Sequence, residues 1–201
     1  LTGGAAARDA TMNERQCGRR LGRRAAWVLC VAVAVAAGGG CSDRDSSDGA
    51  DRTVFGEDSG VRVRLEFPDG WRVRRDKEKV ALMGVAESAE GDRFAANVNV
   101  VIERLPAPMS ARDYWSQAAP RLEGALGDFE AGDVRLVELA GREAARARFG
   151  HRFADVPISC LTFIIVEDRD AFVITCSADR DDYAAFEPRF ERIVDTFGIE
   201  R

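Results

Sequence analysis

The chain has 201 residues, of which 46% are hydrophobic and 31% are charged, and its formal net charge is −5. This balance is typical of a globular protein that builds its own hydrophobic core. Because acidic groups outnumber basic ones, nucleic acid is a poor candidate partner, since its binding depends on basic side chains that neutralise phosphates.

The N-terminal segment has the order of a targeting signal. Residues 1–11 precede the first methionine, Met12, and are interpreted as an overextended reading frame that adds nothing to the signal. Five arginines between positions 15 and 24 are followed by an apolar stretch over 25–37, by three glycines and by Cys41. Residues 12–40 therefore resemble a bacterial lipoprotein signal peptide, which is removed before a cysteine that carries acyl chains.

A permanent membrane span explains this segment less well, because a spanning helix needs about 20 consecutive apolar residues. The apolar stretch is shorter, and Gly38, Gly39 and Gly40 weaken a helix at its end. Gly38 also stands where lipoprotein signals usually carry an aliphatic residue. Ordinary secretory cleavage and an uncleaved anchor stay open, as do the general and twin-arginine export routes. We predict lipidation at Cys41, with the protein anchored by lipid on the extracytoplasmic face of the cell membrane.

Removal of the signal makes the remaining chain more acidic. The first 40 residues hold six arginines and two acidic groups, so the chain from Cys41 has 23 basic and 32 acidic residues and a net charge of −9. This charge disfavours adhesion to anionic lipid, which leaves the acyl chains as the membrane anchor. Residues 41–60 are rich in Asp, Ser and Gly and are predicted to form a flexible tether. Residues 61–201 suit one α+β domain.

Antiparallel strands are predicted at the start of this domain. Apolar and charged residues alternate over 61–67, a turn follows at Pro68 to Gly70, and the alternation resumes at Trp71. Two further strands are predicted over 79–85 and 96–103, with a polar loop between them.

Helices and central strands complete the predicted domain. Ser110 begins a helix with an apolar stripe that extends to Phe129, and Pro120 predicts a kink or a division into two shorter helices. Strands are then predicted over 133–139, 143–153, 158–166 and 171–177, before a last helix from Tyr183 to Phe197. The nearly continuous apolar sequence over 158–166 requires cover on both faces. The sequence therefore predicts an α+β fold, an antiparallel β-sheet with helices packed on both sides.

Four short segments occur in a characteristic order along the domain. They are FPDGW at 67–71, AGREA at 140–144, FVITCSA at 172–178 and the helical segment 186–197. Their order, together with the lipoprotein signal, resembles the PsbP-like proteins, which include a Ran-binding nuclear import factor and the DcrB-like and LpqN-like bacterial lipoproteins. The resemblance covers 61–199. It implies a PsbP-like α/β/α sandwich in a family that mostly binds partners, and it supplies no catalytic residue.

Two cysteines, Cys160 and Cys176, flank a predicted hairpin in an oxidising compartment and are a candidate disulfide. The length of the hairpin loop decides whether their side chains meet. A three-residue loop over 167–169 places them opposite each other on one face, whereas a two-residue loop places them on opposite faces as two packed thiols. Both alternatives stay open at this stage.

Arginines alternate with apolar residues in several predicted strands. They are Arg62, Arg64, Arg72, Arg74, Arg146, Arg148 and Arg152. If the strands are neighbours, these arginines form a basic stripe that binds carboxylate or phosphate groups of an envelope partner. The alternative is an ordinary solvated sheet face, and dispersal of the arginines or their pairing with acids would refute the stripe.

Motifs that specify chemistry are scarce. The sole histidine, His151, shares a predicted face with alanines and phenylalanines and is interpreted as a satisfied core residue. No cofactor or metal site is predicted, because acidic pairs such as Asp168 with Asp170 are explained as turns and helix caps. Trp71, Trp115 and Phe129 are candidates to line a ligand cavity.

The expected function is a non-catalytic binding or accessory module for a protein partner that is secreted or resides in the cell envelope. A cavity lined by the three aromatic residues would instead indicate a carrier of a small or lipidic ligand. A cleft holding carboxyl groups with raised pKa values would indicate a carboxylate-dependent hydrolase.

Overall fold

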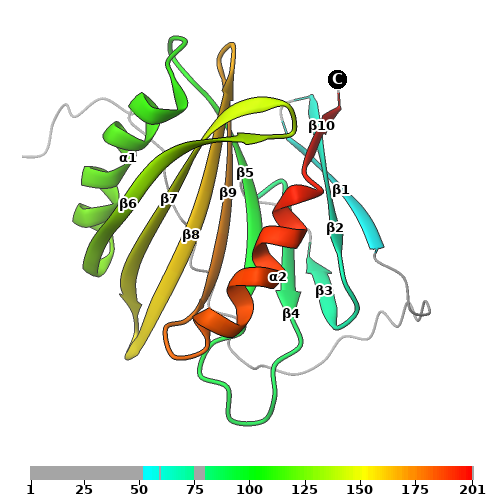
Figure 1. Ribbon diagram of the computed structural model, residues 1–201, viewed down its shortest axis with the longest axis vertical. Helices are drawn as coiled ribbons and strands as arrows, with labels where there is room; N and C mark the ends of the chain where they lie inside the picture. The colour runs from blue at the N-terminus through cyan, green and yellow to red at the C-terminus, as the bar shows by residue number, and fades with distance from the viewer. Residues whose placement is uncertain (1–51, 59, 75–79, 201) are drawn as a thin grey trace, which may run out of the picture.

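Two antiparallel sheets and two helices make up the fold of the described residues (Figure 1). The computed structural model describes residues 52–58, 60–74 and 80–200. The N-terminal extension at 1–11, the predicted signal peptide at 12–40 and the predicted lipidation site Cys41 lie outside the described residues. The elements are β1 (Arg52–Asp58), β2 (Val61–Phe67), β3 (Trp71–Arg74), β4 (Leu82–Ala86), β5 (Asn97–Arg104), α1 (Ala111–Ala125), β6 (Gly127–Leu139), β7 (Arg142–Phe153), β8 (Val156–Glu167), β9 (Asp170–Asp179), α2 (Tyr183–Asp195) and β10 (Gly198–Glu200).

The larger sheet has seven strands in the order β3-β4-β5-β9-β8-β7-β6, and the smaller sheet has three in the order β1-β2-β10. Neighbouring strands pair antiparallel in both sheets. Strands β8 and β9 lie in the middle of the larger sheet, as the apolar sequence of β8 predicted. The α+β prediction is therefore confirmed.

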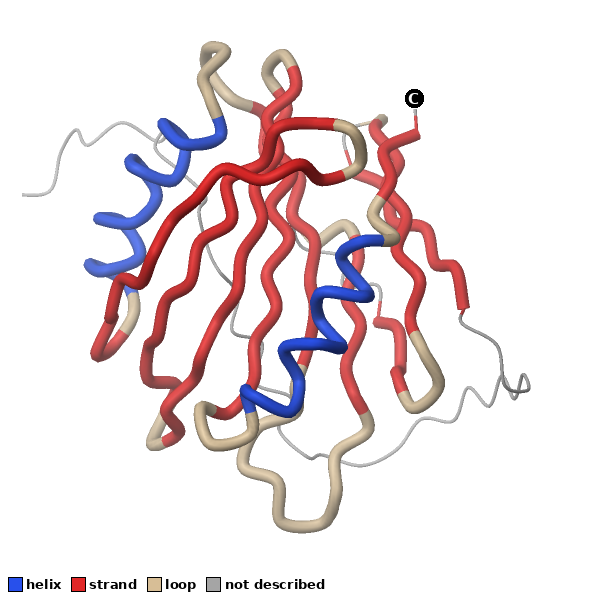
Figure 2. The backbone as a smooth tube through the Cα atoms, in the orientation of Figure 1, coloured by secondary structure: helices blue, strands red, loops and turns tan. Residues whose placement is uncertain are grey.

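Each face of the larger sheet packs in its own core, and Figure 2 shows the two helices at different ends of the sheet's strand order, α1 beside β6 and α2 across the strands near β4. Leu161 and Phe163 of β8 contribute to a core that includes α2 and β2, whereas Cys160 and Ile164 of the same strand contribute to a core with α1. This alternation places α1 on one face and α2 with the smaller sheet on the other. The predicted cover on both faces is confirmed.

The first helix begins where its capping sequence predicted. Ser110 Oγ accepts a hydrogen bond of 3.0 Å from the backbone N–H of Asp113, which satisfies one of the free amides of the first helical turn. The helix then continues through Pro120 to Ala125, so the predicted division into two helices is wrong. Four buried side chains on one stripe, Tyr114, Trp115, Ala118 and Leu122, hold α1 against the sheet and offset the backbone hydrogen bond that proline removes.

The tether prediction over 41–60 is wrong for its last part. Residues 52–58 form β1, which pairs with β2 along its whole length. The buried Gly56 lets the backbone of β1 approach the backbone at Ala81. A Cβ atom at position 56 would lie only 2.1 Å from the carbonyl oxygen of Ala81. Backbone pairing and close approach help to bring this segment into the fold, and composition does not reveal such contributions.

Among the described residues, no helix has the length and apolar character needed to cross a bilayer.

Candidate functional site

The outermost strand of the larger sheet, β6, contains a bulge near its start. Gly127 pairs with Arg152 and Glu130 pairs with Gly150, so two β6 residues, Asp128 and Phe129, lie opposite one residue of β7. Asp128 has a φ of 51°, in the left-handed region that Asp tolerates better than most residues. Bulges redirect side chains and are common beside functional sites.

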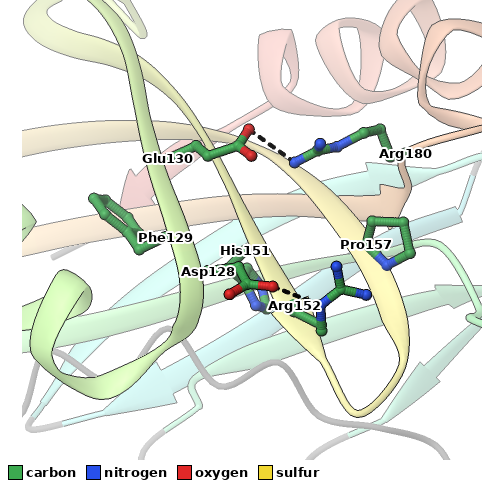
Figure 3. A pocket seen from close by; sticks show the side chains of 7 residues that line it. All are labelled: Asp128, Phe129, Glu130, His151, Arg152, Pro157 and Arg180. Atoms are coloured by element: carbon green, nitrogen blue, oxygen red, sulfur yellow. Dashed lines mark hydrogen bonds and ion pairs between the residues drawn. The ribbon is translucent and has the colours of Figure 1, made fainter.

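The bulge borders a polar pocket of about 300 Å³, here called the bulge slot (Figure 3). Its lining comes from three consecutive strands of the sheet, β6, β7 and β8, and from the residue after β9: Asp128, Phe129, Glu130, His151, Arg152, Pro157 and Arg180. The volume is at the lower end of the range for small-molecule pockets. The slot is therefore the candidate functional site in the described part of the chain.

Two ion pairs cross the slot. Arg152 Nε donates to Asp128 Oδ2 over 2.6 Å, and Arg180 Nη2 donates to Glu130 Oε2 over 3.0 Å. In both pairs the acid belongs to the edge strand β6 and the arginine comes from further inside the sheet. Both pairs therefore have their negative end at the edge of the sheet and their positive end toward its middle (Figure 3). The slot thus has an acidic side and a basic side.

Arg180 is anchored at its backbone, where its N–H donates to the carbonyl of Pro157 over 2.8 Å. Its side chain reaches Glu130 by passing over Gly150, since a Cβ atom on Gly150 would lie 2.7 Å from Arg180 Nη2. A glycine at this position of β7 therefore permits the ion pair to form.

His151 lines the slot and is buried, with 2% of its surface exposed. Its ring stacks on Phe149 at a centroid distance of 6.2 Å. Burial lowers the pKa of His151 below its usual value of 6.5, so the imidazole is neutral at pH 7. Its Nδ1 has no hydrogen-bond partner among the described residues, and unmet hydrogen bonding inside a protein costs free energy. The histidine is buried as predicted, and a hydrogen bond with the backbone of Arg152 satisfies its ring in part.

The predicted basic stripe is wrong, because its arginines are dispersed and paired with acids. Arg146 is 8% exposed, and its Nη2 donates to Glu191 over 2.7 Å and to Glu187 over 3.3 Å. Arg148 also donates to Glu187, and Arg152 pairs with Asp128 in the slot. Helix α2 supplies the acids that neutralise the first two arginines.

The other four arginines of the predicted stripe do not lie on strands next to β7. Arg62 and Arg64 are in β2 of the smaller sheet, where they pair with Glu200 over 3.8 Å and with Glu66 over 3.5 Å. Arg72 and Arg74 lie in β3, at the opposite edge of the larger sheet from β6.

The predicted aromatic cavity is also wrong. Trp71 packs between Phe67 and Phe190 in the core under α2, at centroid distances of 5.7 and 6.3 Å. Trp115 and Phe129 both pack on Phe149 in the other core, at 5.9 and 5.7 Å. The sheet separates Trp71 from the other two, and only Phe129 borders the slot.

The candidate disulfide between Cys160 and Cys176 is wrong as well. Glu167 pairs with Asp170, which leaves a two-residue loop, and Cys176 lies opposite Leu161 rather than Cys160. The two thiols therefore belong to different cores on opposite faces of the sheet. Burial raises the pKa of the Cys176 thiol well above its usual value.

The slot residues Asp128, Glu130 and Arg180 did not emerge from the sequence as candidates. The sequence GDFEAGD at 127–133 carries the available signal, because two glycines interrupt a strand pattern and indicate bulges. Nothing local to Arg180 indicates its partner, since the ion pair joins positions 50 apart.

No protein-family model matches the chain, and no curated protein matches its sequence. Solved structures do match. LpqN of Mycobacterium tuberculosis, described as involved in cell envelope biogenesis, aligns with a TM-score of 0.56 and 16% identity over 76% of this chain and 91% of LpqN. The cyanobacterial PsbP protein CyanoP of Synechocystis sp. PCC 6803 aligns with a TM-score of 0.56 and 14% identity over 81% and 98% of the two chains.

The Ran-binding protein Mog1p of Saccharomyces cerevisiae is similar to a lesser degree, with a TM-score of 0.51 and 11% identity over 74% of this chain and 96% of Mog1p. At these identities the likeness concerns the arrangement of the elements. It agrees with the order of segments that suggested the resemblance, and the chain therefore has the fold that PsbP-like proteins, LpqN and Mog1p share.

Proposed function

We propose that this protein is a membrane-tethered, non-catalytic binding module of the cell envelope. The observation that supports this most is the order of the chain. A lipoprotein-like signal is followed by Cys41, and β1, the first described element, starts at Arg52, eleven positions later. A lipid at Cys41 would hold the domain close to the membrane.

The short connection limits where the domain can act. Eleven residues span at most about 40 Å when fully extended. The domain therefore meets partners within roughly its own diameter of the lipid headgroups, which favours membrane proteins, lipids and material that passes close to the bilayer over distant partners.

The chemistry of the bulge slot favours recognition over catalysis. Its two carboxylates, Asp128 and Glu130, are each paired with an arginine and are 66% and 65% exposed, so the slot offers charged groups for contact and no buried carboxyl group for acid–base chemistry. The descriptions of LpqN, which concerns the cell envelope, and of Mog1p, which binds Ran, agree with a binding role.

The test compares Cys41→Ser with Cys30→Ser, a matched change of a cysteine inside the signal. Metabolic labelling with a fatty acid and fractionation of cells should show labelled protein in the membrane for the natural chain and for Cys30→Ser. Cys41→Ser should lose the label and leave the membrane fraction. Label or membrane attachment that persists in Cys41→Ser would overturn the tether.

The binding role is tested by crosslinking on intact cells. A discrete crosslinked species is expected for the natural chain and for Cys30→Ser, and its yield should fall at least about tenfold for Cys41→Ser, because tethering raises the effective concentration near the membrane. Absence of a discrete species from the natural chain would contradict a protein partner.

A further inference from the structure

The bulge slot is electrically polarised although its charges cancel. Asp128 and Glu130 lie on the side of β6, and Arg152 and Arg180 lie on the side of β7 to β9 (Figure 3). The buried His151 is neutral, so two positive and two negative groups remain. The slot therefore has no net charge that would favour an anion over a cation or the reverse, and a simple ion can use only one of its two sides.

The two ion pairs are dipoles that lie side by side in the same sense (Figure 3). Parallel dipoles placed side by side repel each other, whereas a third dipole of opposite sense between them is attracted to both. A molecule with a positive and a negative end would supply that third dipole. Its positive end would lie toward the two acids and its negative end toward the two arginines.

Hydrogen-bonding capacity remains for such a molecule. The contact between Asp128 and Arg152 uses one carboxylate oxygen and Nε, and that between Glu130 and Arg180 uses one oxygen and one terminal nitrogen. A carboxylate accepts through two oxygens and a guanidinium donates through five N–H groups. All four side chains are also accessible, with exposures of 66% and 48% in the first pair and 65% and 42% in the second.

Apolar residues contribute to the lining as well. Phe129 lies between Asp128 and Glu130 in β6, and its ring packs on Phe149 in the core with α1. The volume of about 300 Å³ suits a small molecule.

We propose that the bulge slot binds a small zwitterion, with its ammonium group toward Asp128 and Glu130 and its carboxylate or phosphate toward Arg152 and Arg180. This inference deepens the proposed binding function and rests on it. The same chemistry occurs in free amino acids and in the phosphoethanolamine headgroup of a lipid, and the test separates these two sources.

The experiment is calorimetric titration of the full chain carrying Cys41→Ser, which leaves every described residue unchanged. The probes are phosphoethanolamine and L-alanine as zwitterions, with ethanolamine, inorganic phosphate and acetate as their separate halves. Each zwitterion that binds should do so at least about tenfold more tightly than either of its halves. If vesicles containing phosphatidylethanolamine displace the bound zwitterion and phosphatidylglycerol vesicles do not, the natural ligand is a lipid headgroup. If the zwitterion binds and neither kind of vesicle displaces it, the natural ligand is a free small molecule.

Variants locate the binding. Arg180→Gln and Asp128→Asn should each weaken zwitterion binding at least about tenfold, one from each side of the slot. Arg104→Gln is the control, because the Arg104 side chain is 59% exposed, like the slot arginines, and forms an ion pair of 2.7 Å with the buried Asp170 outside the slot. Thermal unfolding establishes that the variants fold.

The inference is overturned if neither zwitterion binds, if a half binds as tightly as the whole, or if the folded slot variants bind like Arg104→Gln. Because the titration uses a chain without the anchor cysteine, failure here leaves the membrane tether and the crosslinking result standing. Loss of the tether would likewise leave the titration unaffected.

Discussion

Arg180 and Glu130, fifty positions apart, are joined by an ion pair of 3.0 Å that passes over Gly150 of β7. The pair connects the segment after β9 to the edge strand β6, across the two strands that lie between them in the sheet. It also forms one wall of the bulge slot. The absence of a side chain at position 150 makes this contact sterically feasible, which leads to the first prediction.

Gly150→Ala should disturb the slot with little effect on stability, and Gly84→Ala should do the reverse. The new Cβ at 150 would lie 2.7 Å from the end of the flexible Arg180 side chain, which can move away, whereas the Cβ at 84 would lie 2.1 Å from the buried ring of Phe67. We expect a loss of less than about 1 kcal/mol for the first variant and of about 3 kcal/mol for the second. Urea unfolding measures both, and equal losses would contradict the prediction.

Glu187→Gln should destabilise the domain substantially. Glu187 accepts hydrogen bonds from both Arg146 and Arg148, and the Arg146 side chain is only 9% exposed. Removal of the negative charge leaves the buried Arg146 with Glu191 as its remaining carboxylate partner and takes Glu187 from Arg148, so we expect a loss of about 2 kcal/mol in the free energy of unfolding.

The control for this prediction is Glu200→Gln, which removes the partner of Arg62 in a pair whose side chains are 52% and 42% exposed. Its loss should stay within about 1 kcal/mol, as for other exposed pairs. A loss for Glu187→Gln no larger than that for Glu200→Gln would show that the contacts beneath α2 do not stabilise the fold.

His151 should make stability depend on pH in a defined direction. Burial lowers the pKa of its imidazole in the folded state below the usual 6.5, so below pH 6.5 the unfolded chain binds more protons than the folded one. The stability contributed by the neutral ring is complete above that pH and declines as the pH falls toward the folded-state pKa. The slope can reach about 1.4 kcal/mol per pH unit.

The measurement compares urea unfolding of the natural chain and of His151→Asn between pH 5 and 8. His151 is the sole histidine, so the difference between the two curves isolates its titration. The difference should be constant above about pH 7 and should shift in favour of the variant at lower pH. A difference that is independent of pH would refute the burial argument.

Cys160 and Cys176 should resist alkylation in the folded protein and should not respond to reductant. Their exposed fractions are 2% and 0%, and burial raises the pKa of Cys176, which suppresses the reactive thiolate. Mass spectrometry of the alkylated peptides should show modification of both residues only after denaturation, with and without prior reduction. A peptide pair that is linked before reduction would contradict the strand register.

Local patterns were sufficient for most elements of the fold. The alternation over 61–67, the cap at Ser110 and the apolar run of β8 each depend on neighbours along the chain, and the structure contains the corresponding strand, helix start and central strand. The order of these elements was also enough to indicate the fold shared with PsbP-like proteins. Strand β1 was missed because its place depends on backbone pairing with β2.

The candidate site was decided by tertiary structure. Whether Cys160 meets Cys176 depended on a single residue of loop length, because side chains alternate along a strand. Whether Arg146 and Arg148 were available depended on the acids that α2 brings over β7. The slot required a bulge in β6 and an arginine from beyond β9. Such contacts join residues distant in the chain, and their geometry follows from strand order and register, which no local pattern encodes.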